Sequence, residues 1–108
     1  MIAGSLARRY ARALLDIGRE EGQLRRSLTE VEGFAKVLDG SAELREALES
    51  AHVGRQSKQA TLDTVLAKAD VLPTTKSFLS LLIDKGRMNG LPEVLSELRR
   101  MVEEHEGI

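Results

Sequence analysis

The segment Phe78–Leu95 restricts the fold of this chain more than any other segment. It opens with an apolar run at helical spacing and reaches Gly86, which suits the left-handed position just past a helix end. A short basic turn follows, in which we expect Arg87 to meet the carbonyl end of the preceding helix. Pro92 then suits the first turn of a new helix, where a missing N–H costs nothing. The segment therefore predicts an αα-hairpin and not an active site.

Helical spacing of apolar residues continues through most of the chain and predicts about six helices. They are expected at about Ser5–Glu21, over the stripe Leu24–Leu38, after an N-cap at Ser41, over the stripe Ala60–Ala69, from Pro73, and from Pro92 to a tail that begins at Glu103. The connections are short, so neighbouring helices should be antiparallel. The sequence thus predicts an all-α fold, a compact bundle of about six antiparallel helices.

Composition supports one helical domain, which we place at residues 1–106. Aromatic residues make up only 3% of the 108 residues, so the core must be built from Leu, Val and Ala, which favours helices over strands. The formal net charge of -1 lacks the positive excess typical of proteins that grip phosphate backbones. Cysteine is absent, and no apolar run approaches the length of a membrane span, so we expect no direct membrane insertion.

The first expected helix carries more apolar surface than one buried stripe needs. On a helical wheel Leu6, Tyr10, Ala13 and Ile17 fall close together, and the apolar arc continues through Leu14 over roughly half the circumference. The fifth helix is similar, because Leu81 lies outside its core stripe beside Ser77.

These faces have two interpretations. Both helices could be central and packed on two sides by their own domain. Alternatively, the faces could form a groove for a partner helix. Small residues at Ala11, Ala13 and Gly18 would then allow a partner backbone to approach closely.

The chain shows no constellation of residues for chemistry. His52 and His105 stand alone, without a partner at metal-ligand spacing, and the carboxylates cluster at helix ends and in the tail. Neither a nucleophile elbow nor a phosphate-binding glycine loop is present in the sequence. We therefore expect no catalytic, cofactor-binding or metal-binding residues.

Three arginine pairs leave an alternative open. They are Arg8-Arg9, Arg25-Arg26 and Arg99-Arg100. Such pairs usually belong to a charged helix surface, and carboxylates at Glu93 and Glu97 lie within helical reach of the last pair. The alternative is an RNA-binding helical bundle similar to an antitermination factor, although the near-zero net charge and the few stacking aromatics argue against nucleic acid.

Two motifs resemble one known family. The run Leu6–Gly18 is similar to the first helix of the delta subunit of F-type ATP synthase, with its pattern "A-x-x-Y-A-x-A-L", and the Phe78–Leu95 hairpin resembles the end of that subunit's N-terminal domain. In mitochondria the subunit is called oligomycin-sensitivity-conferring protein. The resemblance covers essentially this whole chain but only the N-terminal part of a usual member, so we expect the family's C-terminal domain to be absent.

The resemblance implies a six-helix bundle at the top of the catalytic head, a non-catalytic part of the stator stalk. It implies a groove between helices 1 and 5 that binds the N-terminal helix of an alpha subunit and so tethers the head during proton-driven ATP synthesis. The residues that match family positions are Tyr10, Ala13, Leu14, Ser77 and Leu81, and the wheel adds Leu6 and Ile17.

The resemblance also implies the wider setting. The absent C-terminal domain would contact the b subunit of the peripheral stalk. The complex would place the chain at the cytoplasmic face of a bacterial inner membrane, as a peripheral subunit, with the organellar equivalent left open. Gly86, Arg87 and Pro92 would act as structural turn residues.

Overall fold

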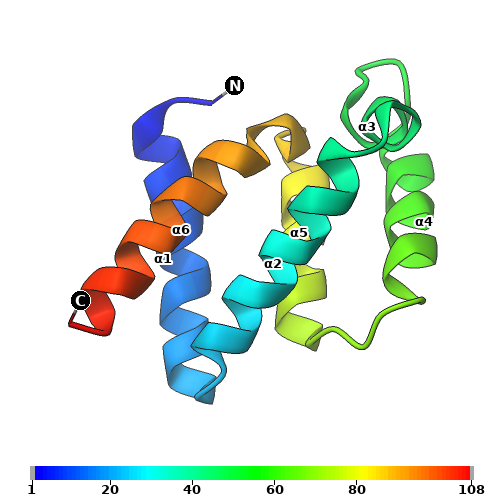
Figure 1. Cartoon of the computed structure of the whole chain (residues 1–108). Coiled ribbons are helices and arrows are strands. Elements are labelled where there is room, and N and C mark those ends of the chain that lie inside the picture. Colours follow the sequence, from blue (N-terminus) through cyan, green and yellow to red (C-terminus); the bar gives the residue numbers. More distant parts are fainter. Residues whose placement is uncertain (1, 108) are drawn as a thin grey trace.

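The computed structural model describes residues 2–107, and within them every regular element is helical (Figure 1). The elements are α1 (Gly4–Glu21), α2 (Leu24–Asp39), α3 (Ala42–Glu49), α4 (Arg55–Leu66), α5 (Pro73–Asp84), the 3-10 turn η1 (Met88–Gly90) and α6 (Leu91–His105). The all-α bundle predicted from apolar spacing is confirmed.

Helix α5 lies in the middle of the bundle, where it contacts α1, α2 and α4. In Figure 1, α1 and α6 form one side, α3 and α4 form the other, and α2 crosses in front. Helices that follow one another, such as α1 and α2 or α4 and α5, run in opposite directions, whereas the closely packed pair α1 and α6 runs the same way. The interpretation of α1 and α5 as helices packed on more than one side by their own domain is therefore correct for most of their apolar residues.

The hairpin between α5 and α6 follows the local rules of its sequence. Gly86 has φ 67°, the N–H of Gly86 donates to the Ile83 carbonyl at 3.0 Å, and the N–H of Arg87 donates to the Leu82 carbonyl at 2.8 Å. This pattern of bonds ends a helix by satisfying its last carbonyl groups. The predicted cap at Ser41 is also present, because its Oγ accepts from the Leu44 N–H at 3.1 Å.

Three boundaries differ from the sequence prediction. The turn before α6 includes the 3-10 segment η1, in which Met88 is buried and anchors the corner. Helix α6 continues to His105 because an ion pair between Arg100 and Glu104, one turn apart, supports its last turns. Helix α4 ends at Leu66, since the Ala69 N–H bonds to the Leu66 carbonyl in a tightened final turn.

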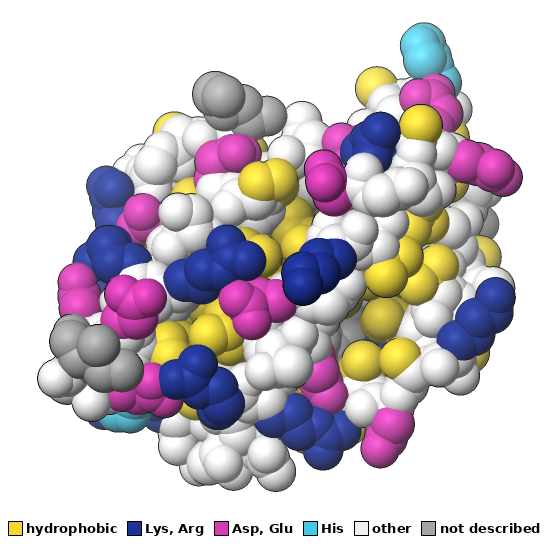
Figure 2. All heavy atoms as spheres, in the orientation of Figure 1, with side chains coloured by type: hydrophobic (Ala, Val, Ile, Leu, Met, Phe, Trp, Pro, Cys, Tyr) yellow, Lys and Arg dark blue, Asp and Glu magenta, His cyan; other side chains and the backbone are white. Residues whose placement is uncertain are grey.

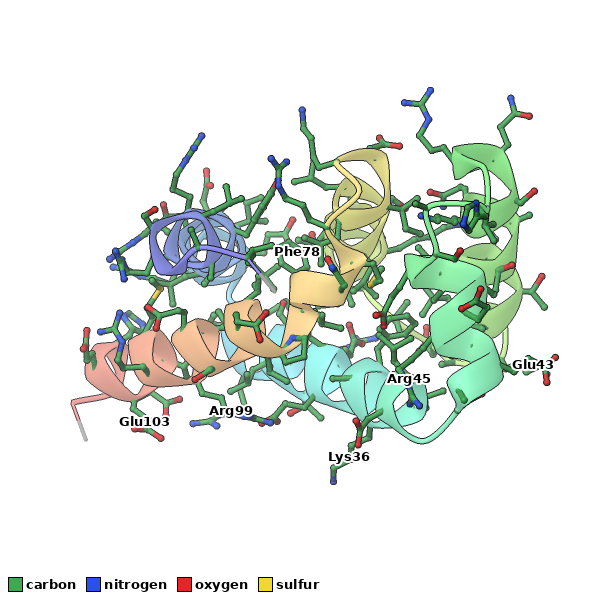
Figure 3. All side chains as sticks on the ribbon, turned by 90° about the horizontal axis from the view of Figure 1, so that it is seen from above. Lys36, Glu43, Arg45, Phe78, Arg99 and Glu103 are labelled. Atoms are coloured by element: carbon green, nitrogen blue, oxygen red, sulfur yellow. The ribbon has the colours of Figure 1, made fainter. Side chains whose placement is uncertain are left out.

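The core is aliphatic, as the shortage of aromatic residues predicted. Its fully buried members include Leu14, Leu62, Leu79, Leu82, Leu91, Leu98, Val31 and Val94. Figure 3 shows Phe78 of α5 pointing into the interior between the helices.

The prediction that three small residues would serve a partner helix is wrong for two of them. Ala11 and Gly18 are buried in the chain's own core. A Cβ atom at Gly18 would lie 3.0 Å from the Leu24 Cα atom, so this glycine lets the start of α2 pack against the end of α1. Only Ala13 remains exposed.

Candidate functional site

A groove runs between α1 and α5 and contains every residue predicted for partner binding. One part, of about 430 Å³, is lined by Ala13, Leu14, Ile17, Glu21, Pro73, Thr74, Ser77, Phe78 and Leu81. The other part, of about 420 Å³, is lined by Leu6, Arg9, Tyr10, Ala13, Leu81, Lys85 and Arg87. Ala13 and Leu81 line both parts, so the two hollows adjoin, and we call them together the α1–α5 groove.

The groove has a buried floor and an accessible apolar rim. Tyr10 and Leu14 are buried and form part of the floor, while Leu6 and Leu81 are half-buried. Ala13 and Ser77 are exposed on opposite helices. The prediction of an unused apolar face on α1 thus reduces to the part around Ala13 and Ile17.

Ile17 is the most exposed large hydrophobic residue in the lining of the groove. Its side chain is 42% exposed, and among the described residues only Val37 is another large hydrophobic residue with comparable exposure. A large aliphatic side chain at the rim of an apolar groove offers area that a partner could bury.

Two hydrogen bonds from α1 lie near the ends of the groove, one to the start of α5 and one to the turn that follows α5. At one end the Thr74 hydroxyl donates to Glu21 at 2.8 Å. At the other end the Arg87 guanidinium donates to the Tyr10 hydroxyl at 3.1 Å. Both bonds bridge the two sides of the groove, which is present in the chain alone.

The side chain of Arg87 differs from its expected role. Its guanidinium contacts Tyr10 on α1 instead of the carbonyl end of α5. The physical reason is that backbone N–H groups of the turn already satisfy those carbonyls, which leaves the side chain free to reach across to the neighbouring helix.

Sequence reasoning missed the polar and structural members of the lining. Glu21 lies one helical turn beyond Ile17, and Pro73 lies one turn before Ser77. Residues spaced in this way share one face of a helix, so helical spacing could have predicted both as members of the lining. The wheel selected apolar residues and therefore passed over them. Gly86 and Pro92 lie in the turn and at the start of α6, where they shape the hairpin without lining the groove.

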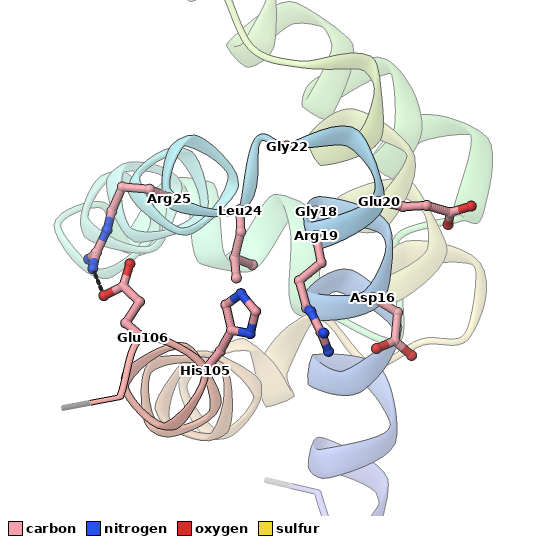
Figure 4. Close-up of a pocket in the computed structure, with 9 residues that line it drawn as sticks. All are labelled: Asp16, Gly18, Arg19, Glu20, Gly22, Leu24, Arg25, His105 and Glu106. Atoms are coloured by element: carbon pink, nitrogen blue, oxygen red, sulfur yellow. Dashed lines mark hydrogen bonds and ion pairs between the residues drawn. The ribbon is translucent and has the colours of Figure 1, made fainter.

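A larger, more polar hollow of about 740 Å³ lies where the ends of α1 and α6 meet (Figure 4). His105 faces it, and an ion pair between Arg25 and Glu106 links α2 to the end of α6. Among residues 2–107, no group of three or more His, Asp or Glu side chains is placed to hold a metal ion.

A second apolar hollow, of about 610 Å³, lies between α2 and the end of α4. Figure 2 shows hydrophobic side chains gathered over this region, and Val37 on its rim is 52% exposed. No residue of this hollow lines the α1–α5 groove. It supplies a matched control surface for experiments on the groove.

Most of the paired arginines are part of a charged helix surface. Arg25, Arg26, Arg99 and Arg100 all form ion pairs, with carboxylates at Glu106, Glu30, Asp70, Glu32, Glu97 and Glu104. In contrast, Arg8 and Arg9 have no carboxylate within 4.0 Å in the described part of the chain. The surface-charge interpretation is therefore confirmed for two of the three pairs. No helix between residues 2 and 107 combines the length and apolarity that crossing a membrane requires.

Comparison with known proteins identifies similar chains. Residues 6–108 match the family described as ATP synthase delta (OSCP) subunit. The chain is 35% identical to the ATP synthase subunit delta of Geobacter metallireducens over 108 residues, which is 100% of this chain and 60% of the relative. It is 39% identical to that of Desulfatibacillum aliphaticivorans over 103 residues, 95% of this chain and 56% of the relative. The chain thus spans at most 60% of the length of these relatives.

Proposed function

The chain belongs to the ATP synthase delta (OSCP) subunit family, and we propose that its α1–α5 groove binds the N-terminal helix of an alpha subunit of F-type ATP synthase. The observation that carries this proposal is the groove itself. All seven residues singled out from the sequence line it, namely Leu6, Tyr10, Ala13, Leu14, Ile17, Ser77 and Leu81.

The proposed role is mechanical. A stalk that holds the catalytic head must resist torque, so the head needs a tight tether. If a partner helix and the groove bury roughly 400 Å² of apolar surface, burial contributes about 10 kcal/mol before the costs of association. Because the groove is present in the chain alone, little ordering of this chain would oppose binding. No bond is made or broken in this role, and it needs no cofactor or metal.

The rest of the assignment follows the family. We propose that residues 1–106 form the N-terminal domain of a two-domain subunit, whose C-terminal domain contacts the b subunit of the peripheral stalk. The complex then holds this chain at the cytoplasmic face of a bacterial inner membrane as a peripheral subunit. The RNA-binding alternative receives no support from the comparisons, and the pairing of four of the six arginines with carboxylates removes much of its basis.

The proposal is tested with matched aspartate substitutions of the two exposed aliphatic residues. Ile17→Asp removes apolar contact and brings a charge to the groove, and should weaken binding of a synthetic alpha-subunit N-terminal peptide by about 10- to 100-fold. Val37→Asp makes the same chemical change on the α2–α4 hollow and should leave the affinity within about twofold of the parent, since sites this separate act independently. Isothermal titration calorimetry measures both. Loss of binding in Val37→Asp with normal binding in Ile17→Asp would move the site to the other hollow.

A further inference from the structure

Resting on the proposed function, we infer that the α1–α5 groove selects its helix by charge, with the carboxylate-bearing end of the occupant against Arg9, Lys85 and Arg87 and the other end against Glu21. The groove is apolar along its middle, but the charged residues in its lining are sorted by sign. Arg9, Lys85 and Arg87 line one part, and Glu21 lines the other.

The basic end keeps its charge available. None of its three cations has a carboxylate within 4.0 Å among residues 2–107, a property that they share with cations outside the groove such as Arg12 and Arg19. Asp84 precedes Lys85 in the chain but makes its ion pair with Arg55 on α4, at 3.9 Å. Arg87 donates to the Tyr10 hydroxyl, which is not a carboxylate partner.

The opposite end is acidic and already oriented. The Glu21 carboxylate accepts from the Thr74 hydroxyl, which holds it at the lip of the groove. The cation nearest to this end along α5, Lys76, lies outside the groove lining and contacts Asp63 on α4 at 3.4 Å. An occupant therefore meets three cationic side chains at one end of the groove and one carboxylate at the other.

The dipoles of α1 and α5 do not decide in which direction the occupant lies in the groove. Helices α1 and α5 are antiparallel here, as the contacts of Glu21 with Thr74 and of Tyr10 with Arg87 require, so their dipoles oppose each other. A helix end carries only about half an elementary charge, whereas each carboxylate of an occupant carries a full one. The occupant's side chains therefore dominate.

The length of the groove sets how many turns of the occupant helix contact it. From Leu6 to Glu21 the α1 side of the groove is about 22 Å long, which corresponds to about four helical turns of a partner. Charges at the two ends of such a helix lie beyond a Debye length of about 8 Å at physiological salt. Each end is therefore recognised separately.

The first test places a nitroxide spin label at the acidic end of the peptide. Two versions of the synthetic alpha-subunit N-terminal peptide are made, with carboxylates confined to the first or the last turn and glutamine replacing the others. The label always marks the carboxylate-bearing end, so in both versions it should broaden the amide signals of Lys85 and Arg87 and spare those of Glu21 and Thr74. The two peptides would then lie in the groove in opposite chain directions. If both peptides instead lie in the same chain direction, or if the label broadens both ends of the groove equally, the inference is overturned and the proposed function stands. Absence of any binding would instead remove the proposed function and this inference with it.

The second test reverses single charges on α1. Arg9→Glu should weaken binding of either peptide by about three- to tenfold at low salt, and by less at high salt, because the contact is screened. Arg12→Glu changes the net charge equally on the same helix but does not line the groove, so it should change the affinity by less than about twofold. Replacing the peptide's carboxylates with lysine should weaken binding to the parent groove more than binding to Arg9→Glu, because Arg9 adds to the repulsion from Lys85 and Arg87 only in the parent. Equal losses for Arg9→Glu and Arg12→Glu, or an equal effect of the lysine peptide on the parent and on Arg9→Glu, would contradict a local contact.

Discussion

At the scale of single residues, Gly86 and Gly33 both lie in open surroundings but have different backbone conformations. No heavy atom lies within 4 Å of the position where either would carry a Cβ atom. Gly86 has φ 67° at the end of α5, a conformation that other L-residues adopt at a cost, whereas Gly33 lies inside α2 with helical geometry. The backbone, and not packing, should therefore decide the effect of adding a methyl group at each.

We expect Gly86→Ala to destabilise the domain by about 1 to 2 kcal/mol because alanine is strained in the left-handed region. Gly33→Ala should stabilise it by about 0.5 to 1 kcal/mol, since glycine weakens a helix interior. Urea denaturation of both variants measures the two changes. A destabilised Gly33→Ala, or a Gly86→Ala as stable as the parent, would contradict this account.

At the scale of elements, Glu30 of α2 fixes the start of α5 and hence one wall of the groove. Leu72, the N-cap residue of α5, offers no side-chain cap, and the Glu30 carboxylate holds this helix end by accepting from the Leu72 N–H at 3.0 Å and from the Thr75 hydroxyl at 2.6 Å. Arg26 donates to the same carboxylate at 2.8 Å and to the Asp70 carbonyl at 2.9 Å. One carboxylate thus ties α2 to the loop that precedes α5.

This arrangement makes stability depend on pH in a defined direction. Burial raises the pKa of Glu30, but hydrogen bonds from Thr75 and Leu72, together with Arg26, outweigh it and leave the pKa below its ordinary value. Because the folded pKa is lower than the unfolded value of about 4.3, the stabilisation is complete above that pH. It is lost as the pH falls through the folded value.

Glu30→Gln should therefore lower the free energy of unfolding by about 1 to 2 kcal/mol at pH 7, and the difference should shrink as the pH falls below about 4. Glu32→Gln on the same helix removes a more exposed pair with Arg99 and should cost less than about 1 kcal/mol. Denaturation curves across pH give both values. A difference that stays constant down to pH 3 would show that the charge of Glu30 contributes nothing.

Sequence reasoning succeeded for elements governed by local rules and failed where distant segments meet. The end of α5 at Gly86 and the cap at Ser41 follow from chemistry within a few residues, so both were predictable. The partners of Glu30 and Arg87 lie on other helices, and helical spacing alone carries no information about which helices adjoin. For the same reason the wheel identified the apolar side of the groove but not its charged ends.

At the scale of the whole molecule, the bundle exposes two separate apolar hollows, and sequence predicted only one. The α1–α5 groove was found because both of its walls carry family motifs and more apolar surface than a single buried stripe needs. The α2–α4 hollow arises because α4 ends early and its following loop folds back toward α2, which no local pattern indicated. A measurement that separates these surfaces therefore tests the functional account directly.

That measurement is a two-dimensional NMR titration of the isotopically labelled chain with the alpha-subunit N-terminal peptide. We predict saturable shifts clustered on Ala13, Ile17, Ser77 and Leu81, the accessible rim of the groove. Shifts clustered on Val37 and Val65 instead, or no shifts at high peptide excess, would contradict the assignment of the α1–α5 groove as the tether.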